Sequence, residues 1–368
     1  MKKKKVCLIS ITISPDSADG EAKFVRALYE YLKKKGYYVK VLTCKWTRDL
    51  KDPNIIQFKV LKRRFLWTVY FYIKTIKYLY SNKFDIIHAN SPKAAIPIIL
   101  SGKKRFITTI HDFTPFETKL TLIPLESLLI KYVAKRSSFI ITVSNFIKNK
   151  FKYYFPKIDF QKIFVVLSGI EEKFKPYPLK ARELRKNLNL QGHILLFIGR
   201  ITSYKGIEYI IQAYEMAKKK IPNLNLIIGG TPDYLMEKTY EEWKEKYKDI
   251  KFVGYIPENE IAYYYSMGDI FITFSSSSEG FGLTPLEAIK CDTPVICSSL
   301  PVFKEILGPN AIYVPPKNTK LLADKIIFLL ENEDFRRKLL EKAQIHAKKY
   351  TIEAVGEKVE KVYEKISN

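Results

Sequence analysis

The sequence lacks the signatures that identify several large classes of protein. Its four cysteines include no C-x-x-C pair and no accompanying histidines, which argues against a disulfide scaffold or a zinc site. No apolar run reaches the roughly 18 residues needed to span a bilayer. The fingerprints G-x-G-x-x-G after a first strand and G-x-x-x-x-G-K-[ST] are absent, which excludes typical dehydrogenases and P-loop enzymes. No D-x-D occurs either, so we expect no bound metal ion and no resident cofactor.

Acidic residues are scarce in the first part of the chain. Residues 1–170 hold 33 Lys and Arg against 11 Asp and Glu, a net charge of +22, whereas the remainder holds 30 against 27, or +3. A genome that favours lysine would bias both parts alike. The asymmetry therefore indicates that the first part faces an anionic partner.

Apolar runs alternate with segments of helical periodicity along nearly the whole chain. Strands are expected in KVCLIS, YYVKVLTC, FDIIHAN, RFITTIHD, SFIITVSN, IFVVLSG, HILLFIGR, LNLIIGG, IKFVGYI, DIFITFSS and TPVICSS, with helices in most of the gaps. Such alternation predicts an α/β protein of two tandem doubly wound, Rossmann-like domains that face each other across a cleft. We read the amino-terminal apolar segment as a first buried strand of a cytoplasmic protein rather than as a signal peptide.

A polar stretch with two prolines, from Gly169 to Leu184, marks the expected domain boundary. We therefore expect an N-terminal domain at 1–170 and a C-terminal domain at 171–350. Residues 351–368 are expected to form a C-terminal helix that packs back on the N-terminal domain.

Polar residues and glycines follow several of the expected strands. Gly199 and Arg200 end one strand, and Lys205 with a further glycine opens the next helix, which suits a phosphate group. His111 follows another strand, and Gly20 precedes the first helix. Ligands of doubly wound sheets lie beyond the carboxyl ends of the strands. Lysines in solvated turns and a hydrogen-bonded strand-end histidine are the structural alternatives.

The segment SSSSEGFGLTPLEA carries two glutamates around a glycine-rich turn, Glu279 and Glu287. Thr284, Pro285 and Glu287 match a capping box, with Thr284 as the N-cap of a helix. That box accounts for Glu287 without any ligand, and a ligand contact explains it equally well. Glu279 lies outside the box and has no local structural role.

Three stretches together resemble the family-4 retaining glycosyltransferases of the GT-B fold. They are GRITSYKG, the long segment from FVGYIPENE through SSSSEGFGLTPLEA to PVFKEI, and ITVSNFIKNKF with VVLSGIEEKFKP. The resemblance spans nearly the whole chain and is strongest from Gly199 to Ile306. One departure is Asp292, where the family usually has glycine; Asp tolerates the left-handed conformation that this position implies.

The resemblance implies a role for each matching residue. Arg200 and Lys205 are expected to hold the diphosphate of a UDP- or GDP-linked sugar, Glu279 the transferred sugar, and Glu287 the ribose. His111 is expected to face the sugar from the N-terminal domain. The expected donor-binding residues are Gly20, Gly199, Tyr255, Ile256, Phe281, Gly282, Leu283 and Glu287. The nucleotide sugar is a co-substrate, and the family's front-face displacement requires no enzyme nucleophile.

The segment RRFLWTVYFYIKTIKYLY is the candidate acceptor or membrane surface. At 100° per residue, Leu66, Val69, Ile73, Ile76 and Tyr80 form one stripe, which we expect to face the core. Aromatics mixed with cations lie beside it, as membrane interfaces favour. Packing of these aromatics under a neighbouring loop is the alternative. The residues assigned to this surface are Arg63, Trp67, Lys74 and Lys77.

Three functional hypotheses follow. The favoured one is a retaining glycosyltransferase, peripheral on the cytoplasmic face of the membrane, with a lipid or lipid-linked saccharide as acceptor. A catalytically silent, donor-binding subunit of a glycosyltransferase complex is the second. The third uses the basic N-terminal domain to bind nucleic acid, and the salt dependence of binding to DNA and to anionic vesicles would distinguish it. The sequence leaves the donor sugar, the base, the acceptor and the oligomeric state open.

Overall fold

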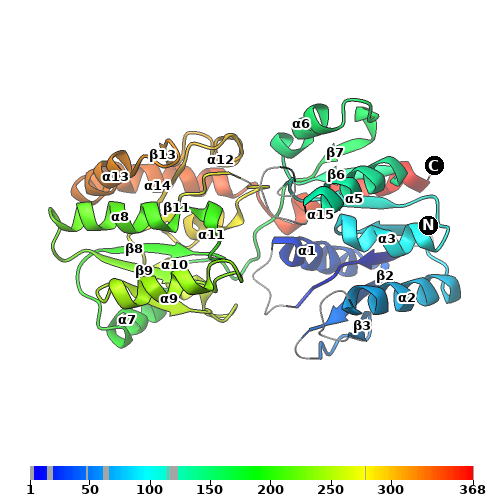
Figure 1. The fold of residues 1–368 in the computed structure, drawn as a ribbon, viewed down its shortest axis with the longest axis horizontal. Helices are drawn as coiled ribbons and strands as arrows, with labels where there is room; N and C mark the ends of the chain where they lie inside the picture. The colour runs from blue at the N-terminus through cyan, green and yellow to red at the C-terminus, as the bar shows by residue number, and fades with distance from the viewer. Residues whose placement is uncertain are drawn as a thin grey trace. The chain divides into compact units, whose positions relative to one another are not determined.

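The computed structural model describes residues 4–14, 20–46, 49–60, 66–113, 116, 123–277 and 279–367. Two compact units divide the chain: unit 1 comprises Met1–Gly169 and Tyr350–Asn368, and unit 2 comprises Ile170–Lys349 (Figure 1). Each unit is a parallel sheet covered by helices, so the prediction of two Rossmann-like α/β domains is confirmed.

Within the described residues, unit 1 has a seven-stranded sheet of order β3-β2-β1-β4-β5-β6-β7. Its strands are β1 (Lys5–Ile9), β2 (Tyr38–Lys45), β3 (Ile55–Lys59), β4 (Ile86–Ala89), β5 (Ile107–Ile110), β6 (Phe139–Thr142) and β7 (Ile163–Val165). Val6 of β1 pairs with Val39 of β2 on one side and with Ile86 of β4 on the other. The strand order therefore reverses between β1 and β4, and a ligand of this sheet is expected at that point.

Helices cover both faces of the unit 1 sheet. They are α1 (Gly20–Lys34), α2 (Leu66–Ser81), α3 (Pro92–Leu100), α5 (Ile123–Arg136), α6 (Asn145–Tyr154), the short η1 (Phe160–Lys162) and α15 (Ile352–Ser367). Helix α3 packs between α2 and α5, and α1 packs on α15 (Figure 1). Ile87 and Ala89 of β4 share a core cluster with Phe71 of α2, whereas His88 bonds to Tyr363 of α15. Because successive strand residues point to opposite faces, the two helix layers lie on opposite sides of the sheet.

The C-terminal helix α15 is tied to unit 1 by polar contacts. The hydroxyls of Tyr31 and Tyr37 donate to the Glu360 carboxylate at 2.5 and 2.8 Å. Arg105 donates to the Ile366 carbonyl at 2.5 Å, at the end of the helix, where cations are favourable. Residues 350–368 therefore complete unit 1 although unit 2 precedes them in the chain.

Unit 2 has a six-stranded sheet of order β10-β9-β8-β11-β12-β13. Its strands are β8 (Ile194–Ile198), β9 (Asn225–Gly229), β10 (Lys251–Gly254), β11 (Ile270–Thr273), β12 (Val295–Ser298) and β13 (Ile312–Val314). Its helices are α7 (Pro178–Asn187), η2 (Ser203–Lys205), α8 (Ile207–Lys218), α9 (Glu237–Lys246), α10 (Ile261–Met267), α11 (Leu283–Lys290), α12 (Pro301–Leu307), α13 (Thr319–Glu331) and α14 (Glu333–Ala347). Leu196 of β8 pairs with Ile227 of β9 and with Phe271 of β11, so the order reverses between β8 and β11.

The sequence assigned the core-facing side of α2 wrongly. Leu66, Val69 and Ile73, from the stripe expected in the core, are 48%, 55% and 50% exposed. The buried residues are Phe71, Thr75 and Leu79, in a second stripe of spacing i, i+4, i+8. The helix is apolar on two sides, so its periodicity did not decide which side faces the sheet.

Other local expectations can be compared directly with the structure. Cys7, Cys44, Cys291 and Cys297 are buried and free. Asp292 adopts the left-handed conformation expected of it, with a φ of 66°. Among the described helices, none is both long and apolar enough to cross a bilayer.

Candidate active site

The loops that follow β8 and β11 are joined at the switch point of unit 2. The Ser276 amide donates to the Tyr204 carbonyl at 2.7 Å, and the Ser276 hydroxyl donates to the same oxygen at 3.3 Å. Gly206 has a φ of +65°, and a Cβ there would lie 2.4 Å from the Phe274 carbonyl oxygen. Only glycine permits both that conformation and that approach, so the end of the first loop is held against the second.

A short ion pair links the two loops. Lys205 Nζ lies 2.5 Å from Glu279 Oε1, and the Ser275 hydroxyl donates to the same oxygen at 2.5 Å. The two charged side chains are 17% and 10% exposed, so both are largely removed from water. Burial lowers the pKa of Lys205, but the Glu279 carboxylate and Tyr204 outweigh it and raise that pKa above its ordinary value. Lys205 is therefore a fixed cation at neutral pH.

Arg200 adds a second cation at the carboxyl end of β8. Its side chain is exposed, and its charge acts against the protonated form of Lys205. Two cations thus lie near one buried carboxylate, leaving a positive excess. The structure brings together Arg200, Lys205 and Glu279, which the sequence had assigned to the diphosphate and the sugar. An anionic group that approaches these loops would meet that excess.

Glu287 is buried in α11, with 1% of its surface exposed. It accepts a hydrogen bond at 3.0 Å from the hydroxyl of Tyr265, which projects from the neighbouring α10. Burial, together with the Glu287 charge, raises the pKa of Tyr265 well above its ordinary value. Tyr265 therefore stays a hydrogen-bond donor over the whole accessible pH range and fixes the position of the carboxylate.

The predicted capping box at Thr284 is wrong. Helix α11 begins at Leu283, and its N-cap is Gly282, in the left-handed region with a φ of 89°. A Cβ at Gly282 would lie 2.6 Å from the Phe303 ring, so glycine is needed here for space as well as conformation. Pro285 is tolerated in the first turn because it lacks an amide that would need a partner. Glu287 lies too far into the helix to cap it.

Of the remaining predicted donor-binding residues of unit 2, Gly199 follows β8, Tyr255 and Ile256 follow β10, and Phe281 lies between β11 and α11. Gly199 donates its amide to the Gly229 carbonyl at 3.0 Å. Ile256 is 5% exposed and its side chain covers Gly229, whereas Tyr255 is 49% exposed. Phe281 is also buried, at 6%. That Tyr255 and Ile256 line a base stays a prediction.

In unit 1, His111 lies at the carboxyl end of β5. Its Nε2 is 3.0 Å from the Asn90 carbonyl oxygen and 3.3 Å from Asn90 Oδ1, and its ring packs edge-on against Phe24. Asn90 also donates to the Glu21 carbonyl in the first turn of α1 at 2.8 Å. The structure thus joins the end of β4, the end of β5 and the start of α1. Gly20 is the first residue of α1.

The residues assigned to the membrane surface divide into two groups. Trp67 packs edge-on against Trp46 at 5.2 Å and borders the core. This side chain is therefore packed inside unit 1, as the alternative interpretation of the aromatic residues expected. Lys74 and Lys77 are exposed. Arg63 lies outside the described residues.

Sequence reasoning missed Ser275, Tyr265 and Asn90. Asn90 ends the expected strand FDIIHAN, so its place at a carboxyl end was a usable signal. Ser275 is one of four consecutive serines, and Tyr265 is one of three consecutive tyrosines. Nothing in either run distinguishes the residue that contacts a carboxylate.

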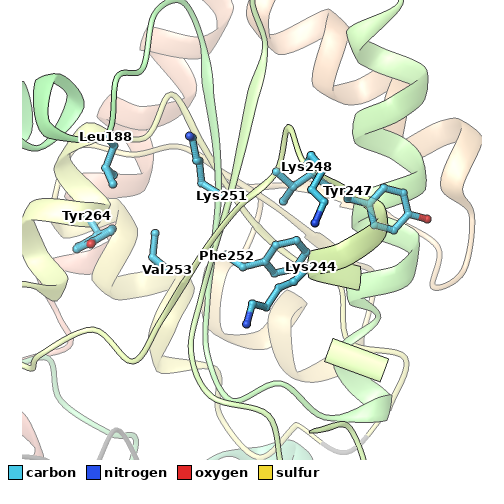
Figure 2. Close-up of a pocket in the computed structure, with 9 residues that line it drawn as sticks. Leu188, Lys244, Tyr247, Lys248, Lys251, Phe252, Val253 and Tyr264 are labelled. Carbon is cyan, nitrogen blue, oxygen red and sulfur yellow. The ribbon is translucent and has the colours of Figure 1, made fainter. Parts of the chain in front are cut away.

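A groove of about 520 Å³ lies elsewhere in unit 2, along the edge strand β10 (Figure 2). It is lined by Leu188, Lys244, Tyr247, Lys248, Ile250, Lys251, Phe252, Val253 and Tyr264. None of these is a predicted site residue. Over the described part of the chain, no group of three or more His, Cys, Asp or Glu is arranged to hold a metal ion.

The fold and the charged switch point define a class of protein: two Rossmann-like units of the GT-B kind found in glycosyltransferases. The chain is similar to sucrose-phosphate synthase from Thermosynechococcus elongatus, with a TM-score of 0.82 at 22% identity over 99% of both chains. It is also similar to Anabaena HepE in complex with UDP-glucose, with a TM-score of 0.82 at 16% identity over 98% of this chain and 100% of that one.

Two family models match the chain in tandem. The model for Glycosyltransferase Family 4 matches residues 18–174, and that for Glycosyl transferases group 1 matches residues 180–346. The chain therefore belongs to the family-4 glycosyltransferases.

Curated relatives include enzymes with saccharide and lipid acceptors in their names. The O-antigen chain mannosyltransferase RfbU of Salmonella typhimurium is 28% identical over 79% of this chain and 76% of that protein. The alpha-monoglucosyldiacylglycerol synthase of Streptococcus pneumoniae is 26% identical over 83% of this chain and 73% of that protein.

Proposed function

We propose that this glycosyltransferase binds a UDP- or GDP-linked sugar at the switch point of unit 2 and transfers the sugar with retention of its anomeric configuration. The observation that carries the proposal is the ion pair of Lys205 with Glu279, with Arg200 close enough for its charge to act on Lys205. Breaking the bond between the sugar and the diphosphate adds negative charge to the leaving group. Two fixed cations stabilise that charge without reorganising when it forms.

The other residues of unit 2 position the donor. We assign Glu279 to the hydroxyls of the transferred sugar and Glu287 to the ribose. The backbone of Phe281, Gly282 and Leu283 approaches sugar and phosphate, which the absence of a side chain at Gly282 permits. Tyr255 and Ile256 border the base. His111 and Gly20 of unit 1 are assigned to the sugar and the diphosphate.

Retention follows from a front-face displacement. The bond from the anomeric carbon to the diphosphate oxygen breaks, and a bond to the acceptor oxygen forms on the same face of the sugar. The acceptor's hydroxyl proton passes to the departing diphosphate, so no enzyme nucleophile or metal is needed in the step. Catalysis then consists of charge stabilisation and positioning.

We propose that the acceptor is a lipid or a lipid-linked saccharide met at the cytoplasmic face of the membrane. The names of the curated relatives support a saccharide chain or a diacylglycerol glycolipid as acceptor. The excess positive charge of unit 1 supports an anionic surface as partner.

Donor hydrolysis by the whole chain tests the proposal. A panel of UDP- and GDP-linked sugars is incubated with the wild type, and release of nucleotide and the configuration of the freed or transferred sugar are followed by NMR. We expect one donor to be cleaved with retention, and Lys205→Ala to lower the rate of cleavage by about 10²–10³. The exposed Lys248, in the groove on β10, supplies Lys248→Ala as a matched control that keeps activity. A chain that binds a nucleotide sugar but never cleaves it would be the silent subunit instead.

A further inference from the structure

The large apolar side chains that unit 1 exposes are concentrated on one helix layer. Among the described residues of unit 1, all exposed large hydrophobic side chains lie on α2, α3 or α5, except those of Tyr38 and Tyr153. The exposed residues of the layer are Leu66, Val69, Tyr70, Ile73 and Tyr80 on α2, Leu100 on α3, and Leu128 and Tyr132 on α5. The three helices pack side by side, so these side chains belong to one outer face (Figure 1). We call it the α2-α3-α5 face.

The same face is almost free of acidic residues. Helices α2 and α3 contain no Asp or Glu, and the only acidic residue in α5, Glu126, is 2.7 Å from Lys93 of α3. The cations on and beside these helices are Lys74, Lys77, Lys93, Lys103, Lys104, Lys131, Lys135 and Arg136. Most surfaces mix the two signs evenly, whereas this face has a large excess of positive charge.

Two of the cations lie over exposed tyrosine rings. Lys74 Nζ is 5.3 Å from the centre of the Tyr70 ring, and the Arg136 guanidinium is 5.4 Å from that of Tyr132. Val69 and Ile73, each about half exposed, lie on the same helix as Lys74 and Lys77. Apolar side chains flanked by aromatics and cations suit the boundary between headgroups and acyl chains. Nucleic acid offers phosphates to the cations but nothing to the aliphatic residues.

We propose that the α2-α3-α5 face docks on an anionic lipid bilayer, with Val69 and Ile73 entering the headgroup region and Lys74 and Lys77 bound to lipid phosphates. The inference rests on the proposed function, because a lipid acceptor has to be met at a membrane. The membrane-facing residues differ from those expected from the sequence. Trp67 packs on the core, and the exposed stripe with Val69 and Ile73, which the sequence had placed in the core, takes its role. The occupant is a bilayer because charge and apolar exposure coincide on one face.

The opposite helix layer provides a matched control. Lys358 and Lys361 are exposed on α15, which covers the other side of the unit 1 sheet through the bond between Tyr363 and His88. Lys74→Glu with Lys77→Glu and Lys358→Glu with Lys361→Glu change the net charge equally. If vesicle binding depended only on the net charge of the protein, the two variants would lose equal affinity.

The test is sedimentation of the full-length protein with vesicles at low salt. One set contains phosphatidylcholine alone, and the other contains phosphatidylcholine with phosphatidylglycerol. We expect binding to the second set only, weakening as salt is added. The α2 charge variant should bind at least about 25-fold more weakly, roughly fivefold for each cation lost. Val69→Gln with Ile73→Gln should weaken binding on the order of tenfold, and the α15 variant should bind like the wild type.

Three outcomes would overturn the docking proposal. The first is no binding to anionic vesicles, and the second is an equal loss of vesicle affinity in the α2 and α15 charge variants. The third is vesicle binding that is unchanged in Val69→Gln with Ile73→Gln and is competed by duplex DNA. The last would identify a nucleic-acid surface. Donor hydrolysis, measured for each variant without vesicles, separates this proposal from the catalytic one. Hydrolysis without vesicle binding refutes only the docking, and vesicle binding without hydrolysis of any donor refutes only the proposed function.

Discussion

Units 1 and 2 arrange their first six strands in the same order, yet the two switch points differ in chemistry. Between β1 and β4 of unit 1, Asn90 and nearby His111 lie in a network of hydrogen bonds to hydroxyl, amide and backbone oxygens. Between β8 and β11 of unit 2, Lys205 and Glu279 form a buried ion pair beside Arg200. The same strand order thus carries a hydrogen-bonded network in one unit and a buried ion pair in the other. The loops after the strands, rather than the sheet, determine what each unit can bind.

The outer surfaces of the units differ in the opposite sense. Residues 1–170, which form most of unit 1, carry +22 and residues 171–368 carry +3, so most of the positive charge lies in unit 1. In unit 2, Lys205 and Arg200 place positive charge at the loop that follows β8. In unit 1 it is spread over helices. We interpret this as a division between donor chemistry in unit 2 and recognition of an anionic partner by unit 1.

The largest expected effect is loss of turnover when a cation is removed from the unit 2 switch point. Arg200→Ala and Lys205→Ala should each lower kcat by about 10²–10³, the usual cost of losing one preorganised charge-stabilising group. Arg200→Ala should leave the thermal midpoint unchanged because its side chain is exposed. Lys205→Ala should also lower it, since Glu279 is left buried without its partner. Steady-state kinetics measure kcat, and melting curves measure the thermal midpoint. A kcat within threefold of wild type in both variants would contradict a catalytic role for the unit 2 switch point.

Acidification should destabilise unit 1 through His88. This histidine is 2% exposed, and burial, together with the charge of His111, lowers its pKa to about 3 from an ordinary 6.5. Between these values the unfolded chain binds a proton that the folded unit excludes, so stability falls as the pH drops below about 6.5. At pH 5 the loss is about 2 kcal/mol, at roughly 1.4 kcal/mol per pH unit.

Hydrogen exchange followed by mass spectrometry resolves that loss by unit. Peptides from β4 and β5 should lose protection at pH 5 relative to pH 7 after correction for intrinsic rates. In His88→Gln the same peptides should be less protected at pH 7, because the bonds to Tyr363 and Thr109 change, but should respond less to pH. An unaltered pH response in that variant would remove His88 from the explanation.

A smaller effect is expected at Glu287 and Tyr265. Glu287→Gln should weaken nucleotide binding by about tenfold, since a ribose hydroxyl then donates to a neutral acceptor. Tyr265→Phe should do so by a few-fold, because the carboxylate keeps its charge but loses the donor that positions it. Calorimetric titration with UDP and GDP gives both affinities. Unchanged affinity in Glu287→Gln would leave the residue with a purely structural part in the packing of α10 on α11.

The sequence predicted the features for which its pattern allows a single structure. Alternation of apolar runs and helical periods leaves few architectures other than doubly wound sheets, and the strand ends at Gly199 and His111 follow from it. The edge strands β3 and β13 were not predicted, because glutamine interrupts the apolar run in IIQFK and IYV has only three residues. Local rules failed where tertiary contacts decide. Gly282, pressed against Phe303, starts α11 before the capping box, and α2 turns Phe71 rather than Ile73 inward.

The division of labour between the units is tested most directly by nucleotide affinity. Binding of UDP and GDP is titrated with the wild type, Lys205→Ala of unit 2 and His111→Ala of unit 1. The account predicts at least tenfold weaker binding for Lys205→Ala, which would expose the diphosphate to an unpaired Glu279. It predicts affinity within twofold of wild type for His111→Ala, because we assign His111 to the sugar alone. Equal losses in the two variants, or none in Lys205→Ala, would contradict it.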